Sequence, residues 1–579
     1  MSLKLLDKGR CFVKIRTFGL MLLTVANIGL APLSSQADSL SGPYLAAQRA
    51  FAAGDFEQAA EYYQRVLAID PENIGMADSA MSSLVALGDF EAALPFAQLL
   101  TSQGNVSQIA NMVVMLDHIK ADRWAKVQSD LEAGLAVSDM IDGAVQAWGA
   151  LAQGNVGDAI EGFDAIIATE GLSAFGSYQK ALALAYVGDF EGAEDLFGDP
   201  ANTSMLRNTR ALIAQGQVLG QLGRTDDAIA LLSRADPLSS DTAIQSLLAR
   251  LTAGETVPFD GITNPKEGLA EVFLTVAVAI QDEAPEAYTL AYSWAAHELA
   301  PTRSDAILTT AELYDALGRY DLSSATFAMI SPEDPAFLDA EIGRAAVLEA
   351  DGRNDAAIEV LQQLARTYPE SGYVATTLGD SLRRVEDYKQ ADSVYTTALD
   401  LYGDDASSAW FIYFARGISR ERLNRWDDAE SDFRAALELR PGHPSVLNYL
   451  GYSLVDRGEK LDEALSLIEQ AVAAQPNNGA IIDSLGWALF KLGRFEEAVP
   501  VLERGSELEA TDPVVNDHLG DALWVVGRKL EAQFQWQRAL SFDPEEDEAT
   551  RIRRKIAIGL DAVMIEEGKD PLSVARGDN

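Results

Sequence analysis

The sequence predicts an all-α fold, a solenoid of stacked helical hairpins. The clearest stretch covers residues 485–544. Gly486 and Gly520 lie 34 residues apart there, and Ala498 and Ala532 repeat the same spacing. A fixed period near 34 with two apolar helical runs per period is typical of helix–turn–helix repeats. The 579 residues exceed what one compact core accommodates, whereas each unit of a repeat array needs only its neighbours.

Within each period a short phrase marks the turn between the two helices. It reads Gly-Asp-Phe-Glu-X-Ala at residues 54–59, 88–93 and 188–193, with variants at 154–159 and 223–228. Glycine ends the first helix because it adopts a positive φ at little cost. The acidic residues suit the positive end of the second helix, and alanine lets the two helices approach closely. These positions therefore belong to the scaffold.

The repeat pattern breaks between residues 252 and 267. This segment contains Gly254, Pro258, Gly261 and Pro265 and has no helical period. A loop of this length inside a helical array is unusual, and it is either functional or a flexible joint. We therefore expect five parts: a signal peptide (1–37), an N-terminal repeat block (38–252), an interrupting loop (253–267), a C-terminal repeat block (268–546), and a capping helix with a tail (547–579).

The segment after Pro544 has the pattern of an amphipathic helix. We expect Arg551, Arg553, Arg554 and Lys555 on its polar side. A repeat array needs a terminal element with a polar outer face to cover its last apolar surface. A cap is therefore the first interpretation, and a basic docking helix is the alternative.

The chain is strongly acidic, with a formal net charge of −43. Such a surface repels nucleic acid and anionic lipid, whose binding rests on Lys and Arg contacts with phosphate. We therefore expect no nucleic-acid partner. Two interpretations of the charge remain. Either it keeps a soluble protein from aggregating, or it forms a surface that attracts basic partners.

The first 37 residues have the features of an export signal. A basic start precedes an apolar run at residues 18–33, and residues 35–37 (Ser-Gln-Ala) supply the small side chains that a signal peptidase recognises. We expect cleavage after Ala37 and no transmembrane span in the mature chain, with retention of the signal as an anchor as the alternative. The only cysteine, Cys11, lies before the apolar run. The mature chain would thus have neither a disulfide nor a lipid-acceptor cysteine.

The sequence contains no catalytic constellation. Its histidines are His118, His297, His443 and His518, none near another, and no zinc-binding spacing exists. Neither a phosphate-binding glycine loop nor a nucleophile elbow is present. Because repeats take up nearly all of the chain after residue 40, we expect a non-enzyme. We predict no catalytic, metal-binding or cofactor-binding residues.

The informative positions are those that the repeat scaffold does not require. First helices of stacked hairpins line the concave face, the usual binding surface of such arrays. Projection from each unit's glycine places aromatic and polar residues at the outward positions of these helices, a composition that suits recognition of a segment of another protein. The predicted partner-binding residues are Phe411, Phe414, Asn448, Tyr452, Asp483, Trp487, Phe490, Asp517 and Trp524, with Ile418 and Asp521 beside them. For Trp487 and Trp524, packing between repeats is an equal alternative.

The period, the turn phrase and the run at residues 485–544 resemble the tetratricopeptide repeat (TPR) family. The resemblance covers nearly all of the chain after residue 40. It implies a right-handed superhelical solenoid that binds other proteins or peptides. Chaperone-binding members of the family carry Lys, Asn and Arg at the corresponding concave positions, and that pattern is not reproduced here. A chaperone tail is therefore not an expected ligand.

A narrower resemblance rests on the chain length, on residues 259–263 (Phe-Asp-Gly-Ile-Thr), and on the run from residues 447–452 to 485–487. These features are similar to a family of Gram-negative envelope proteins that act as adaptors of a carboxyl-terminal processing protease. The resemblance implies a periplasmic scaffold that delivers clients to an envelope protease, with peripheral association with the outer membrane as an alternative. The missing lipid-acceptor cysteine departs from the family's lipoprotein members. The competing hypothesis is an envelope assembly factor that binds polysaccharide or peptidoglycan, with Tyr452, Trp487 and Trp524 stacking on sugars.

Overall fold

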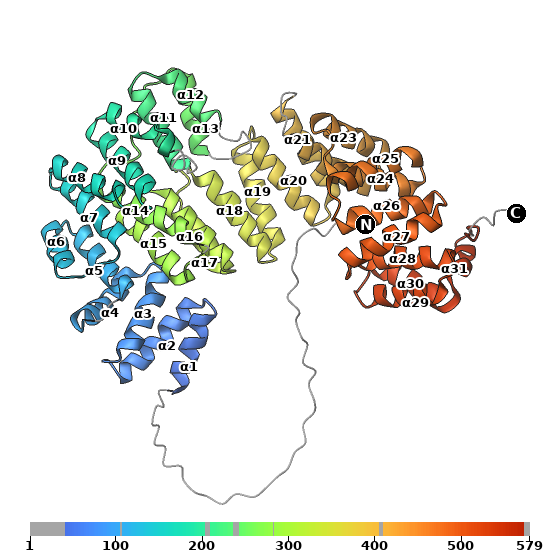
Figure 1. Ribbon diagram of the computed structural model, residues 1–579, viewed down its shortest axis with the longest axis horizontal. Coiled ribbons are helices and arrows are strands. Elements are labelled where there is room, and N and C mark those ends of the chain that lie inside the picture. The colour runs from blue at the N-terminus through green and yellow to red at the C-terminus, as the bar shows by residue number, and fades with distance from the viewer. Residues whose placement is uncertain are drawn as a thin grey trace, which may run out of the picture. The chain divides into compact units, whose positions relative to one another are not determined.

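The computed structural model describes residues 41–104, 107–202, 209–234, 242–281, 283–403 and 409–572. Within these ranges every regular element is a helix, with thirty-one α-helices and one short 3-10 helix (Figure 1). The expected all-α repeat fold is therefore confirmed. The predicted signal peptide at residues 1–37, with Cys11, lies outside the described residues, so its cleavage stays a prediction.

The chain forms two compact units whose boundary falls between Ser381 and Leu382. We call residues 41–381 the N-terminal unit and residues 382–572 the C-terminal unit. The boundary lies within α20 (Gly372–Arg384). Residues 253–267, the expected interrupting loop, lie inside the N-terminal unit, and the division into two repeat blocks stays a prediction.

The helices of the N-terminal unit before α20 are α1 (Ser41–Ala52), α2 (Phe56–Ile69), α3 (Ile74–Ala86), α4 (Phe90–Ser102), α5 (Gln108–Lys120), α6 (Trp124–Glu132), α7 (Asp139–Ala152), α8 (Val156–Ile167), α9 (Ser173–Val187), α10 (Phe190–Phe197), the 3-10 helix η1 (Pro200–Asn202), α11 (Thr209–Gln221), α12 (Thr225–Leu232), α13 (Thr242–Thr252), α14 (Pro265–Ile280), α15 (Glu286–Leu299), α16 (Ser304–Ala316), α17 (Tyr320–Phe327), α18 (Phe337–Ala350) and α19 (Asn354–Thr367).

The helices of the C-terminal unit after α20 are α21 (Tyr388–Tyr402), α22 (Trp410–Arg422), α23 (Trp426–Leu439), α24 (Pro444–Arg457), α25 (Leu461–Ala474), α26 (Gly479–Lys491), α27 (Phe495–Leu508), α28 (Pro513–Val525), α29 (Lys529–Leu540), α30 (Glu546–Ile558) and α31 (Leu560–Glu566). Consecutive helices pair as hairpins, for example α22 with α23 and α26 with α27. We call the two members of a hairpin its first and second helix.

The turn phrase acts as its residue types predict. Asp55, Asp89 and Asp189 precede second helices, and each side chain accepts a hydrogen bond from the backbone N–H three residues further on. Such a cap satisfies one of the free N–H groups at the start of a helix. Gly88 and Gly188, which end first helices, have φ values of 80° and 87°. Only glycine adopts this conformation readily, so the recurrence of glycine there follows from backbone sterics.

In the N-terminal unit the chain turns back on itself after α13. The hairpin of α14 and α15 packs against α3, α5, α7 and α9 (Figure 1). All four are first helices of their hairpins. The face that first helices present in this part of the array is therefore covered by helices of the same chain.

Two tryptophans show how closely this hairpin fits. A Cβ added to Gly268 of α14 would lie 2.5 Å from ring carbons of Trp148 in α7, and one added to Gly88 would lie 2.8 Å from the ring of Trp294 in α15. The Nε1 of Trp294 donates to the hydroxyl of Tyr314, 3.1 Å away. Burial raises the pKa of Tyr314 to about 12. These contacts are as tight as those of a protein core.

A buried ionic cluster joins the hairpin to the array. Glu271 of α14 is 1% exposed, and its carboxylate accepts hydrogen bonds from the Tyr178 hydroxyl (3.0 Å), Arg210 Nε (3.0 Å) and Arg303 (3.1 Å). Arg303 also pairs with Asp305. Burial raises the pKa of Tyr178, and the charge of Glu271 raises it further. Because a buried charge is tolerated only when it is paired, this cluster fixes α14 against α9 and α11.

Residues 253–264 connect α13 to α14 and lie along α11. Val257 is 1% exposed, and Gln217 of α11 donates to the carboxylate of Asp260 at 2.5 Å. Asn264 caps α14 by accepting from two backbone N–H groups, so the helix begins at Pro265. The last three residues of the expected interrupting loop are therefore helical. The segment links two parts of one unit.

The C-terminal unit keeps the repeat most regularly. A Cβ added to Gly486 would lie 2.5 Å from Leu502, and one added to Gly520 would lie 2.5 Å from Trp536. Both glycines thus stand where the second helix of the same hairpin crosses the first. After the last hairpin, Ile552 of α30 and two residues of α31 join the apolar core of α26 to α29.

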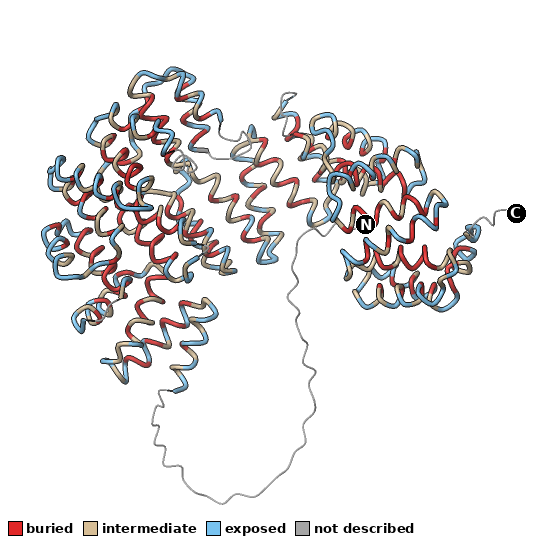
Figure 2. Tube along the Cα trace, in the orientation of Figure 1, coloured by how far each residue is buried: buried red, intermediate tan, exposed pale blue. Residues whose placement is uncertain are grey.

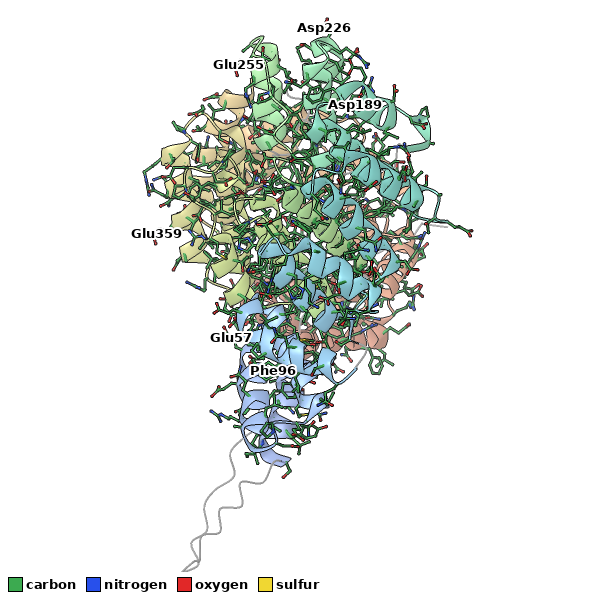
Figure 3. The ribbon with its side chains drawn as sticks, turned by 90° about the vertical axis from the view of Figure 1, so that its left-hand side faces the viewer. Glu57, Phe96, Asp189, Asp226, Glu255 and Glu359 are labelled. Carbon is green, nitrogen blue, oxygen red and sulfur yellow. The ribbon has the colours of Figure 1, made fainter. Side chains whose placement is uncertain are left out.

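Buried residues line the contacts between helices in both units, and exposed ones line their outer sides (Figure 2). In the N-terminal unit the outer edges carry carboxylates, of which Figure 3 labels Glu57, Asp189, Asp226, Glu255 and Glu359. All five are exposed. Since they point into solvent, they account for part of the net charge without contributing to the core.

Candidate protein-binding face of the C-terminal unit

Equivalent positions of successive first helices form two rows in the C-terminal unit. Each step along a row is 34 or 35 residues, which is one repeat. The first row consists of Phe414, Asn448, Asp483, Asp517 and Arg551, and the second of Ile418, Tyr452, Trp487, Asp521 and Lys555. The two members on each helix are four residues apart and therefore share one face of it. We call the surface formed by both rows on α22, α24, α26, α28 and α30 the first-helix face.

Asp483 and His518 connect α26 to α28 on this face. Asp483 is fully buried, and its Oδ2 lies 2.9 Å from Nδ1 of His518. Burial alone would lower the pKa of His518, but the charge of Asp483 and the hydrogen bond to it outweigh burial, so the pKa is raised. The charges of Asp517 and Asp521 act in the same direction. His518 therefore holds its proton more tightly in the folded unit than an exposed histidine does.

The ring of His518 also stacks on Trp487. The two ring centres are 3.9 Å apart and the planes are inclined by 10°. Phe490 stacks on the same indole at 4.8 Å, and Lys491 Nζ lies 5.2 Å from the ring centre. Trp487 is therefore engaged by three neighbours within its own unit.

Asp517 and Asp521 on α28 are neutralised by the terminal helix α30. Lys555 Nζ lies 2.5 Å from a carboxylate oxygen of Asp517 and 2.6 Å from one of Asp521. Its side chain is fully buried and its Nζ lies 5.5 Å from the ring centre of Trp536. The expectation that Lys555 lies on the polar side of this helix is wrong, because stacking places it between α28 and α29. Arg551, Arg553 and Arg554 are not buried in this way.

The part of the face on α24 lacks such cations. Asn448, Tyr452 and Asp456 follow one another at intervals of four residues. Asn448 is 7% exposed, and its Oδ1 has no hydrogen-bond partner in the part of the chain that the structure describes. Asp456 is exposed, and no ion pair to it occurs among the described residues. This region is therefore more negative than the region at α28.

The aromatic members of the predicted set have different surroundings. Phe411 is 37% exposed, whereas Phe414 packs against Phe433 and Tyr449 at ring distances of 6.0 and 5.7 Å. Trp524 donates from Nε1 to Asp561 at 3.0 Å. Of these rings, Phe411 presents the most surface to a partner.

Expected and observed exposure agree for only part of the predicted set. Asn448 is 7% exposed, Asp483 fully buried and Phe490 5% exposed, so the outward orientation expected for them is wrong. Asp483, for example, is covered at the contact with the next hairpin, where it meets His518 of α28. Five others are partly exposed: Phe414, Tyr452, Trp487, Asp517 and Trp524. Their role in binding stays a prediction.

Ionisable residues outside the predicted set also contribute to the charge of this face. His518 and Lys555 take part in the charge pattern of the first-helix face, yet neither belongs to the predicted partner-binding set. The signal that could have found Lys555 and Arg551 is the row itself. Continuing the spacing of Asp483 and Asp517 by one more repeat leads to Arg551.

A search for other kinds of site gives nothing in the described ranges. No group of three or more His, Cys, Asp or Glu side chains there is arranged to hold a metal ion. No helix in those ranges has the length and apolar character needed to span a membrane.

The fold and this face define a helical-repeat solenoid of stacked hairpins. The chain belongs to the tetratricopeptide repeat family. Models described as "Tetratricopeptide repeat" match residues 45–73, 178–242, 339–371, 414–479 and 459–517. Repeats of this family imply a scaffold for protein–protein interaction, and the fold is generally non-enzymatic.

Several curated proteins share part of this sequence. The TPR repeat-containing protein PA4667 of Pseudomonas aeruginosa is 27% identical over 173 residues, which is 30% of this chain and 28% of that protein. The chloroplastic tetratricopeptide repeat domain-containing protein PYG7 of Arabidopsis thaliana is 27% identical over 124 residues, 21% of this chain and 41% of that one. The chain therefore spans less than half the length of the curated relatives it matches.

Solved structures of similar fold include the Cut9–Hcn1 hetero-tetramer of the APC/C. The match has 17% sequence identity and a TM-score of 0.38, and it covers 91% of this chain and 97% of that one. The match to yeast Tom70 has 15% sequence identity and a TM-score of 0.34, and it covers 74% of this chain and 96% of Tom70.

Proposed function

We propose that this chain is a non-enzymatic scaffold that binds partner proteins on the first-helix face of its C-terminal unit. The observation that carries the proposal is the pair of rows on α22 to α28. They hold aromatic and polar side chains that the hairpin scaffold does not require, and several of them keep exposed surface. Aromatic anchors among polar groups are typical of protein interfaces.

Part of the N-terminal unit is closed to a partner. Its first helices α3, α5, α7 and α9 are covered by α14 and α15, with Glu271 and Trp148 buried at the contact. A partner would have to displace a core-like interface to reach that face. The first-helix face of the C-terminal unit requires no such displacement within its own unit.

For location and role, we propose a periplasmic adaptor that delivers client proteins to an envelope protease. The export-signal pattern at residues 1–37 and the resemblance to protease adaptors support this proposal. The proposal predicts two kinds of partner, a protease and its clients. Both would be recovered with the chain from the periplasm.

The test is affinity purification of the tagged, exported chain under mild conditions, followed by mass spectrometry. The Phe411→Ala and Tyr452→Ala variants should lose partners that the wild type retains. Phe534→Ala is the matched control, because this aromatic is 69% exposed on the second helix α29. Thermal unfolding of each variant separates lost binding from lost folding. Recovery of no specific partner, or equal recovery by the Phe411 and Phe534 variants, would overturn the proposal.

The purified chain also tests the competing hypothesis, in which the protein binds polysaccharide or peptidoglycan instead of partner proteins. Trp487 has His518, Phe490 and Lys491 against its ring, and Trp524 has Lys529 Nζ 4.4 Å from its ring centre. Such rings have little free face for stacking on a sugar. Binding of purified envelope glycans that is abolished by Tyr452→Ala, without any protein partner, would replace the adaptor proposal.

A further inference from the structure

A tryptophan, an arginine and an exposed phenylalanine meet where α22 begins. The guanidinium carbon (Cζ) of Arg440 lies 4.8 Å from the ring centre of Trp410, and the ring of Phe411 meets the same indole edge-on at 5.9 Å. The ring of His443 packs on this indole as well, at 4.3 Å. Arg440 is exposed and Phe411 is 37% exposed, so both are open to a partner. We call these four residues the Trp410 site.

The charge of Arg440 has no carboxylate to neutralise it in the part of the chain that the structure describes. Arg434 and Arg457, the nearest arginines along the chain, lie 3.0 and 3.1 Å from glutamate oxygens. Arg457 also lies over an indole, that of Trp426, at 4.9 Å. No ion pair to Arg440 occurs among the described residues. Arg440 thus combines the stacking seen at Arg457 with a charge that is left unpaired.

Two observations show that this positive charge acts locally. Burial lowers the pKa of His443, and the charge of Arg440 lowers it further. Glu438 is the closest acidic residue along the chain, but side chains two positions apart on a helix do not face each other. The Trp410 site is therefore locally positive, although the chain as a whole is acidic.

The contact with Trp410 leaves the hydrogen-bonding edge of the guanidinium free. A cation is attracted to the face of an indole without being neutralised by it. The N–H donors of arginine lie in the guanidinium plane and form a fork that matches a carboxylate. No side-chain hydrogen bond from Arg440 occurs in the described chain. Its donors are therefore available to an acceptor on another molecule.

The short connection between α23 and α24 holds this arginine and histidine in place. Arg440 ends α23, and His443 precedes α24. Pro441 and Pro444 flank the two residues between which the chain turns, and Gly442 has a φ of 78°. Proline fixes its own φ, so the turn has few alternative conformations. A partner therefore meets a site that is already ordered, which lowers the entropic cost of binding.

We propose that the Trp410 site binds an aspartate or glutamate side chain of the partner protein, next to an apolar side chain that packs on Phe411. The assignment rests on the proposed function and specifies the chemistry of the segment that Phe411 contacts. The carboxylate accepts two hydrogen bonds from the Arg440 guanidinium, and the apolar side chain covers the exposed part of the Phe411 ring. The net charge of −43 does not prevent this contact, because charges beyond a screening length of about 8 Å contribute little at physiological salt.

The test compares two capped dipeptides as probes of the full chain, acetyl-leucyl-glutamate amide and its neutral counterpart, acetyl-leucyl-glutamine amide. The indole N–H resonances of the protein report binding by NMR, and the Trp410→Phe variant assigns the resonance of that residue. The glutamate probe should shift this resonance and bind about fivefold more tightly than the glutamine probe, the upper range for an exposed ion pair. Arg440→Gln should remove the preference, and Arg440→Lys, which keeps the charge without the planar fork, should retain part of it.

Arg538→Gln is the matched control. Arg538 is partly exposed on α29, forms no ion pair among the described residues, and changes the net charge by the same amount when it is replaced. This variant should keep the preference for the glutamate probe within about twofold, since its charge lies in another repeat. Equal loss of the preference in both variants would mean general attraction of anions to exposed cations and would overturn the inference. So would equal binding of the two probes to the wild type.

Failure of the inference is distinguishable from failure of the proposed function. In the affinity purification, Arg440→Gln should lose the partners that Phe411→Ala loses, while thermal unfolding shows that the exposed substitution leaves the fold intact. If partner proteins depend on Phe411 and not on Arg440, the scaffold assignment stands and carboxylate recognition is excluded. If no partner is recovered at all, the proposed function fails, and the inference fails with it.

Discussion

The indole of Trp148 lies directly over the Cα of Gly268, although the two residues belong to α7 and α14. A methyl group on this glycine would come within 2.5 Å of three ring carbons. Trp148 cannot move aside easily, because it is fully buried, donates to Gln179 at 3.0 Å and packs edge-on against Phe163. This contact shows that α14 packs tightly against α7 in the N-terminal unit.

Gly268→Ala should therefore destabilise the N-terminal unit by about 1–3 kcal/mol, the usual cost of overpacking a core. Hydrogen exchange of α7 and α14 would report the loss locally. Gly220→Ala in α11 is the control, since its added Cβ would meet Leu251 at 3.5 Å, an ordinary contact. Alanine there should be neutral or mildly stabilising because of its helix propensity. Equal protection in the Gly268 variant and the wild type would contradict the close contact.

Glu271→Gln should cost the unit roughly 3–5 kcal/mol, because it leaves Arg210 and Arg303 without the buried carboxylate that they share. Denaturant unfolding followed by hydrogen exchange would show early opening of α9, α11 and α14. Glu286→Gln, an exposed change in the first turn of α15, serves as the control and should leave the transition unchanged. A similar small effect for both variants would show that the cluster does not hold α14 in place.

The pKa values of three histidines should depart from the ordinary value in different directions. Burial lowers the pKa of His297 and of His443, whereas the pKa of His518 is raised by Asp483 despite burial. NMR titration of the imidazole resonances, assigned with single His→Gln variants, checks the order of these three pKa values. Asp483→Asn should lower the pKa of His518, because burial is then opposed only by the charges of Asp517 and Asp521.

The same shift gives a stability prediction with a definite sign. The folded-state pKa of His518 lies above the unfolded value of about 6.5, so the pair with Asp483 contributes its full stability below that pH. The contribution is lost as the pH rises through the folded pKa. The difference in unfolding free energy between wild type and His518→Gln should therefore shrink at alkaline pH. A difference independent of pH would show that stacking on Trp487, and not the charge, is what His518 contributes.

Lys555→Gln should destabilise the end of the array by about 3–5 kcal/mol at neutral pH, since it removes the buried cation that Asp517 and Asp521 share. Only Arg551, 3.6 Å from Asp521, then remains beside them. Burial raises the pKa of Asp517 and the charge of Lys555 opposes that rise, so the variant should recover part of its stability as the carboxylates become protonated in acid. Protection of α28 and α30 amides from exchange measures the effect. Arg553→Gln, an exposed change on the same helix, should leave α28 unaffected.

The 34-residue period sufficed to predict the class of fold and the anatomy of each hairpin. Caps such as Asp89, turn glycines such as Gly88 and crossing glycines such as Gly486 act within one hairpin, so their spacing in the sequence is their spacing in the structure. The same logic identified the rows of first-helix positions, because equivalent residues recur once per repeat. It could not say which row members are exposed, since Asp483 is buried by a neighbour from the next hairpin.

Only the tertiary structure decided that α14 and α15 cover four first helices of the N-terminal unit, α3, α5, α7 and α9. The contacts that hold them, from Trp148 to Gly268 and from Tyr178 to Glu271, join residues far apart in the chain, and no local period encodes such a pairing. It also decided that Lys555 is a buried counter-ion, because a lysine on an amphipathic helix looks the same in sequence whether it meets water or two carboxylates. The period determined each hairpin, whereas the return of the chain onto α3, α5, α7 and α9 depends on contacts between residues far apart in the sequence.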